Sequence, residues 1–102
     1  MQPILKNKLP QLISLLKAHK VKRAYAFGSV CTDNFNDESD IDLLISFNEG
    51  IDPIEYGDLY WSLDEKLPQL FNREVDILTE KQVRNPHFIK VMNRSKTLLY
   101  EG

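Results

Sequence analysis

Apolar residues recur with a helical rhythm in three parts of the chain. In the first part they occupy positions 5, 9, 12, 13 and 16, a spacing that predicts an amphipathic helix. We expect this helix to begin at Pro10, because proline lacks a backbone N–H and suits the first helical position. Its end is expected near His19.

The second helical part follows Asp52-Pro53, which reads as an N-cap and a first helical residue. Apolar residues at 56, 59, 60, 63 and 67 then share one face, and Pro68 and Asn72 mark the exit. In the third part, residues 79–82 match a capping box and predict a helical turn. After Asn85-Pro86 the pattern continues as a helix over 87–94.

Short apolar runs between turn residues predict four strands, over 21–27, 41–47, 74–78 and 97–100. Ser29 can cap a short helix that reaches Thr32 or beyond. The predicted order is therefore α-β-(α)-β-α-β-α-β. It indicates one domain over residues 1–102 with an α/β or α+β fold on a small sheet.

Composition narrows the class of protein. The 102 residues are 42% hydrophobic, and no apolar run reaches the roughly 18–20 residues of a membrane span. The N-terminus lacks the apolar core of a signal peptide. The single cysteine, Cys31, fits a reducing cytoplasm. A core of this size is small, so a homo- or hetero-oligomeric partner could add stability.

Charge is distributed unevenly along the chain, although the net charge is only −2. Residues 24–65 hold eleven of the fifteen acids and no Lys or Arg, so all thirteen basic residues lie in the flanks. The negative balance argues against a nucleic-acid binder. Most of these acids are expected on solvated surfaces. A cation-binding role is considered only for Asp40 and Asp42.

Asp40 and Asp42 lie two apart at the start of the second strand, so their side chains should project to the same face. Two adjacent carboxylates repel unless a proton or a cation neutralises them. Mg²⁺ takes one or two carboxylates and completes its shell with water and phosphate oxygens. Asp76, in the strand over 74–78, supplies a third carboxylate if that strand lies beside 41–47.

The turn Gly28-Ser29 follows the first strand. Glycine permits close approach of the backbone, N–H groups at a helix start attract anions, and a serine hydroxyl adds one donor. Such a turn suits a nucleoside triphosphate. Together with the carboxylates it points to metal-dependent phosphoryl or nucleotidyl transfer.

Three features of the chain, taken in order, resemble the minimal nucleotidyltransferases of the DNA polymerase β-like superfamily. They are Gly28-Ser29, then Asp40-Ile41-Asp42, and finally Asp76 between two apolar residues. These small proteins are often encoded beside HEPN-domain toxins. The resemblance covers nearly the whole chain and implies a mixed sheet flanked by helices.

The resemblance also implies chemistry. Two Mg²⁺ ions would be held by Asp40, Asp42 and Asp76, and Asp76 would help to deprotonate the acceptor hydroxyl. Gly28 and Ser29 would bind ATP or another nucleoside triphosphate. The implied activity is transfer of AMP from ATP to a hydroxyl, a tyrosine of a partner HEPN toxin, with the chain acting as an antitoxin.

The sequence departs from the family pattern after the turn. Many members carry a small residue, Arg and Gly there, whereas this chain has Cys31, Thr32 and Asp33. Phosphate charge must then be met by metal, by backbone amides or by basic residues from elsewhere. The candidates are Lys20, Lys22, Arg73 and Lys81.

The alternative reading is a binding module that neutralises its partner by complex formation, without catalysis. The missing arginine favours it, as do aromatic residues of the kind enriched at interfaces, although most of them should fill the core. These aromatics are Phe35, Phe47, Tyr56, Tyr60, Trp61 and Phe71. His19 and His87 have no metal-ligand spacing and are expected on the surface.

Overall fold

The computed structural model describes residues 2–31, 36 and 38–102 and places the elements in the predicted order. The helices are α1 (Pro3–Ala18), α2 (Pro53–Phe71) and α3 (Pro86–Ser95), with a short 3₁₀ helix η1 (Gly28–Cys31). The strands are β1 (Val21–Phe27), β2 (Ile41–Phe47), β3 (Val75–Thr79) and β4 (Thr97–Glu101). Three helices on one small mixed sheet confirm the predicted α+β class.

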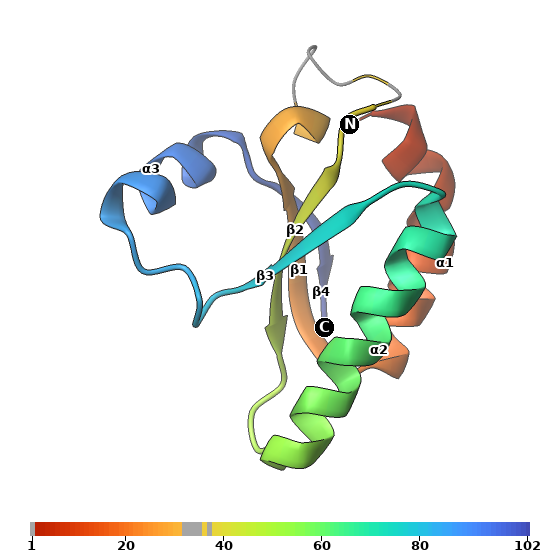
Figure 1. Cartoon of the computed structure of the whole chain (residues 1–102), viewed down its shortest axis with the longest axis vertical. Coiled ribbons are helices and arrows are strands. Elements are labelled where there is room, and N and C mark those ends of the chain that lie inside the picture. Colours follow the sequence, from red (N-terminus) through yellow and green to blue (C-terminus); the bar gives the residue numbers. More distant parts are fainter. Residues whose placement is uncertain (1, 32–35, 37) are drawn as a thin grey trace.

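The four strands form one sheet in the order β3-β2-β1-β4. β1 pairs antiparallel with β2 and with β4, whereas β2 and β3 are parallel and are joined through α2. Figure 1 shows α1 and α2 together on one side of the sheet and α3 alone on the other side. The start of β2 and the end of β1 therefore meet at one end of the sheet, and the ends of β2 and β3 lie at the other.

The main core fills the space between the sheet and the helix pair α1/α2. Alternate residues of β2 point into it, namely Ile41, Leu43 and Ile45, and each is fully buried. The opposite face of the sheet carries a smaller cluster in which Phe27 and Leu44 pack with Met92 of α3. This side is only partly covered, so polar residues of the same strands can reach solvent there.

The expectation that the first helix begins at Pro10 is wrong, because α1 starts at Pro3 and Pro10 lies inside it. An internal proline costs a helix about 3 kcal/mol. Leu5 lies before Pro10, Leu12 and Leu16 lie after it, and all three are buried in the core. Burying a leucine side chain contributes about 2 kcal/mol, so packing on both sides of the proline offsets its cost.

Residues 79–82 form a turn and not a helix, and they make only one of the two bonds of the predicted capping box, because the Gln82 N–H bonds to the Thr79 carbonyl instead of the Thr79 hydroxyl. The Gln82 side-chain Oε1 accepts from the Thr79 N–H at 3.0 Å, and the Gln82 N–H donates to the Thr79 carbonyl at 3.0 Å. The chain then turns, and α3 begins only at Pro86. There the Asn85 side chain accepts hydrogen bonds from the N–H groups of His87 and Phe88, which fixes the helix start.

His19 is buried, contrary to the expected surface position. Its Nδ1 lies 2.7 Å from the Leu15 carbonyl, which can only accept, so Nδ1 donates. Nε2 then accepts from the Ser62 hydroxyl at 2.8 Å. The imidazole thus joins the end of α1 to the middle of α2. No helix in the described part of the chain is long and apolar enough to cross a membrane.

Candidate active site

Asp42 and Asp76 lie opposite each other in the parallel pair of β2 and β3. The neighbours of Asp42 in β2, Ile41 and Leu43, point into the main core. Because side chains alternate across a strand, the two aspartates project to the other face of the sheet. Asp40 lies just before β2, two residues from Asp42, and is near enough for its negative charge to act on the Asp42 carboxyl. The structure thus brings together the carboxylates that the sequence pattern singled out.

The electrostatics of the site are dominated by like charges. The pKa of Asp42 is raised to about 6 by burial of its carboxyl first, then by the negative charge of Asp76. A hydrogen bond that the protonated Asp42 carboxyl shares with Asp76, and the charge of Asp40, act in the same direction. At neutral pH this pair therefore holds unfavourable charge that a proton or a cation would relieve.

Gly28 brings the backbone at the end of β1 against this pair. Its φ is +75°, a conformation that residues with a side chain rarely adopt. A Cβ at this position would lie 2.5 Å from Oδ2 of Asp42. The glycine is therefore required twice, for its φ and for the space that the Asp42 carboxylate occupies.

The predicted short helix after the strand is η1, which includes Ser29 and ends at Cys31. The side chain of Ser29, and all of Thr32 and Asp33, lie outside the described residues. The Cys31 thiol donates to the Ala26 carbonyl at 3.3 Å, so the cysteine is used in local packing.

A hollow of about 530 Å³ opens beside the two aspartates. Its wall includes Asp64 and Tyr60 of α2, which the sequence analysis had not assigned to the site, and the ring of Phe88 from α3. Phe88 packs edge-on against Phe27, with ring centroids 6.1 Å apart. The Tyr60 hydroxyl donates to the Ile77 carbonyl at 3.0 Å and so fixes α2 to β3 beside Asp76.

Sequence reasoning missed Asp64 and Phe88 because their positions depend on how helices cross the sheet. The only available signal for Asp64 was its spacing of four from Tyr60 on an amphipathic helix. Phe88 is one apolar residue of the helix predicted over 87–94, and its type gives no sign that two fifths of its surface is exposed. Both contribute to a hollow that combines carboxylates with an aromatic wall.

The four basic candidates for phosphate binding separate in space. Arg73 lines a second hollow that shares Asp64 and Asp76 with the first. Its Nη1 also donates to the carbonyls of Asn36 at 3.0 Å and Ser39 at 2.9 Å, which holds the chain that leads to Asp40. The other three lie at the opposite end of the sheet: Lys20 is paired with Glu55 at 2.8 Å, and Lys22 and Lys81 line a separate cavity.

The donor set at the site suits a hard cation such as Mg²⁺, since it consists of carboxylate oxygens whose mutual repulsion a cation would relieve. In the described part of the chain, no three His, Cys, Asp or Glu side chains converge closely enough to enclose an ion. The expected three-carboxylate cluster is thus a close pair, Asp42 and Asp76, with Asp40 beside it. Waters and phosphate oxygens would have to complete the shell of a bound ion.

Comparison with known sequences gives consistent matches. The family described as "Polymerase beta, Nucleotidyltransferase" matches residues 10–102. Two Methanocaldococcus jannaschii proteins, each named a putative protein adenylyltransferase, are similar to this chain. One is 33% identical over 87% of this chain and 91% of its own length. The other is 35% identical over 71% of this chain and 70% of its own length.

Solved structures share the fold. A putative minimal nucleotidyltransferase superposes with a TM-score of 0.69 at 28% identity, over 91% of this chain and 90% of its own. A toxin–antitoxin structure with AMP-PNP gives 0.71 at 22% identity, over 92% of this chain and 73% of the other. A Shewanella oneidensis complex of a tri-AMPylated HEPN toxin with an MNT antitoxin gives a TM-score of 0.66 at 20% identity. This match covers 95% of this chain and 72% of the other.

Proposed function

The chain belongs to the polymerase beta nucleotidyltransferase family and is a nucleotidyltransferase, and we propose that it transfers AMP from ATP to a protein hydroxyl. The acceptor we propose is a tyrosine of a HEPN-type partner, which the modification would inactivate. The names of the sequence relatives support the first part. The toxin–antitoxin complexes among the structural neighbours support the second.

One observation carries the proposal, namely the Asp42–Asp76 pair set against the Gly28 backbone. Burial and the charge of Asp76 raise the pKa of Asp42, and this supports a role for a cation, because a bound cation would relieve the unfavourable negative charge. We propose that Asp40, Asp42 and Asp76 hold Mg²⁺, with two ions when ATP is bound. When bound, the cations would polarise the α-phosphate and offset the charge on pyrophosphate.

The residues of the chain have separate roles in the proposed reaction. The acceptor oxygen forms a bond to the α-phosphorus of ATP, the bond from that phosphorus to the bridging oxygen breaks, and pyrophosphate leaves. Asp76 takes the proton from the acceptor hydroxyl. The Gly28 and Ser29 backbone positions the triphosphate, and Arg73 keeps Asp40 in place through the carbonyls of Asn36 and Ser39. ATP and Mg²⁺ are available in the cytoplasm, where we propose that the reaction occurs.

The test uses the purified chain, ATP, Mg²⁺ and the protein encoded beside it. The expected product is that partner carrying the mass of one or more adenylyl groups, with a tyrosine as the modified residue. Asp42→Asn and Asp76→Asn should abolish the product while leaving the fold intact. A folded chain that modifies no partner, at any Mg²⁺ concentration, contradicts the proposal.

A second function, neutralisation by binding alone, is favoured by one observation. The hollow beside Asp42 is lined by three carboxylates and by no Lys or Arg among its described residues, which is an unfavourable setting for a triphosphate without metal. If the double variant Asp40→Asn/Asp42→Asn neutralises the partner as well as the unmodified chain at equal dose, binding is sufficient. If neutralisation is lost while the complex still forms, catalysis is required.

A further inference from the structure

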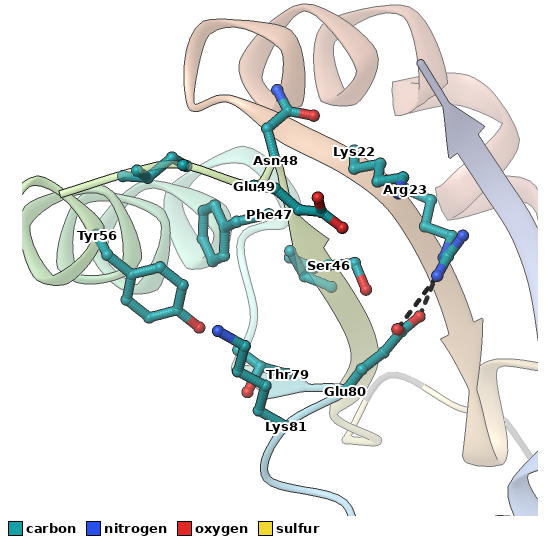
Figure 2. A pocket seen from close by; sticks show the side chains of 13 residues that line it. Lys22, Arg23, Ser46, Phe47, Asn48, Glu49, Tyr56, Thr79, Glu80 and Lys81 are labelled. Atoms are coloured by element: carbon teal, nitrogen blue, oxygen red, sulfur yellow. Dashed lines mark hydrogen bonds and ion pairs between the residues drawn. The ribbon is translucent and has the colours of Figure 1, made fainter. Parts of the chain in front are cut away.

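A cavity of about 230 Å³ lies at the end of the sheet away from the aspartates. It is formed where β2 and β3 end, by residues 45–51 and 79–81, together with the start of β1 and Tyr56 of α2 (Figure 2). None of the site residues Gly28, Asp40, Asp42 and Asp76 lines it. The proposed transfer of AMP therefore assigns no role to it.

A β-bulge in β1 directs two basic residues into this cavity. In the pairing with β2, Val21 is opposite Phe47 and Arg23 is opposite Ser46, so Lys22 is an extra residue in β1. Val21 and Ala24 both remain buried in the main core, while the neighbours Lys22 and Arg23 line the same cavity. In a regular strand two successive side chains would point to opposite faces. Bulges are known to re-aim side chains in this way.

The charges around the cavity are only partly matched. Arg23 donates to both carboxylate oxygens of Glu80, at 3.1 and 3.3 Å, so these two charges are matched and the pKa of Glu80 is lowered. Figure 2 shows this pair on one side of the cavity and Lys81 on another. Among the described residues, neither Lys22 nor Lys81 forms an ion pair. Glu49 is the one further carboxylate of the lining.

The remaining wall is aromatic. Phe47 and Tyr56 pack edge to face with ring centroids 4.9 Å apart, and the Lys81 ammonium lies 5.8 Å from the Tyr56 ring centroid. The cavity is thus lined by two unmatched lysines from different sides, Lys22 beside Arg23 and Lys81 beside Tyr56, and its apolar surface lies next to Lys81 (Figure 2). Ser46 and Asn48 add a hydroxyl and an amide to the lining.

We propose that this cavity is a second binding site, for a small phosphate-bearing molecule. A phosphate monoester carries close to two negative charges at neutral pH, which two lysines can match. Lys22 and Lys81 would contact the phosphate, and the body of the ligand would pack against the Phe47–Tyr56 wall. Because the cavity is smaller than the roughly 300–1,000 Å³ of typical ligand pockets, a single phosphate group with a small body fits it better than a triphosphate.

Titration by NMR tests this site directly. The folded chain, in EDTA and at constant ionic strength, is titrated with inorganic phosphate and with AMP. Saturable shifts are expected at the amides of 46–51 and 79–81 and not at Gly28, Asp42 and Asp76. Tighter binding of AMP than of inorganic phosphate would show that the nucleoside part of the ligand packs against the aromatic wall. Equal affinities would restrict recognition to the phosphate group.

Matched variants separate a built site from general attraction to lysine. Lys22→Gln and Lys81→Gln should each weaken binding about tenfold, the loss of one charge-assisted contact. Lys66 is an exposed lysine of α2 outside the lining. Lys66→Gln should therefore leave binding unchanged, as should Asp42→Asn. Shifts that grow linearly without saturating, or an equal loss in Lys66→Gln, would overturn the proposal. Retained binding in the Lys22→Gln/Lys81→Gln double variant would overturn it as well.

Discussion

The two ends of the sheet hold opposite electrostatic situations. At one end Asp42, Asp64 and Asp76 surround a hollow that no basic residue lines among those described. At the other end three cations line a cavity with two carboxylates, and one of these carboxylates is bound to Arg23. The acidic end leaves like charges together, whereas the basic end pairs Arg23 with Glu80 within the protein and leaves Lys22 and Lys81 without an ion pair among the described residues.

This contrast follows from strand direction. Because β2 and β3 are parallel, the acids near their starts gather at one end, and Glu80 and Lys81 after β3 gather near the loop after β2. Repulsion between neighbouring carboxylates is typical of a site that binds a cation. An ion pair within the protein, by contrast, stabilises the folded chain. The acidic end is thus less stable without its ligand, whereas the Arg23–Glu80 pair stabilises the basic end whether or not a ligand is bound.

The largest expected effect comes from Gly28→Ala. The new Cβ would lie 2.5 Å from Oδ2 of Asp42, so the carboxylate must move away from Asp76. A displaced catalytic group costs on the order of 100-fold in rate, measured as the rate of AMP transfer to the partner.

Gly50→Ala is the matched control. Gly50 also has a positive φ, +78°, but nothing lies within 4 Å of its added Cβ. Both variants should lose about 1–2 kcal/mol of unfolding free energy from the strained backbone, and only Gly28→Ala should lose activity. Equal activity in the two variants would show that the contact with Asp42 is irrelevant.

A smaller effect is expected from Asp42→Asn on stability without metal. The folded-state pKa of about 6 lies above the ordinary value of 3.8, so this carboxyl favours folding below pH 4 and loses that contribution as pH rises through 6. At pH 7.5 in EDTA, Asp42→Asn should therefore be more stable by about 1 kcal/mol, a value reduced because the carboxyl is partly exposed.

Urea unfolding at pH 4 and pH 7.5 measures this difference, which should be close to zero at pH 4. Adding Mg²⁺ at pH 7.5 should raise the stability of the unmodified chain and leave Asp42→Asn unchanged. At ten times its Kd an ion contributes about 1.4 kcal/mol. If Asp42→Asn is less stable than the unmodified chain at pH 7.5 in EDTA, the ionised Asp42 carboxylate does not destabilise the fold and this prediction is wrong.

The smallest effect, and one of opposite sign, is expected from Glu80→Gln at the basic end. The pKa of Glu80 is lowered first by its hydrogen bond to Arg23, so its contribution is present above pH 4.5 and is lost as pH falls. Because the pair is partly exposed, the variant should lose only a few tenths of a kcal/mol at pH 7.5. Urea unfolding of both variants in the same buffer gives the comparison, and a stabilised Glu80→Gln would remove the contrast between the two ends.

Much of the acidic end could be predicted because its signals are local. Alternation in a strand places Asp40 and Asp42 together, and a glycine after an apolar run predicts a turn. Placing Asp76 beside Asp42 required one further assumption, that β2 and β3 are neighbours in the sheet. Two strands joined through one helix are commonly neighbours. The catalytic roles of Asp40, Asp42, Asp76, Gly28 and Ser29 stay predictions.

The rest depended on packing that sequence spacing does not encode. Pro10 was expected to start a helix because the burial of Leu5 before it could not be known. His19 reads as a polar residue at a helix end, and only its bond to Ser62 reveals why it is buried. The basic cavity was not predicted, because a bulge at Lys22 depends on pairing with β2 and leaves no mark in the hydrophobic pattern.

That bulge also has a genetic consequence. Since Lys22 is the extra residue in β1, deletion of its single codon would restore a regular strand in which Val21 and Ala24 still face the core and Arg23 still faces Glu80. The lysine would be lost without any substitution in the hydrophobic core or at the aspartates. Related chains could therefore acquire or discard the basic cavity by a one-codon insertion or deletion while the nucleotidyltransferase end is inherited unchanged.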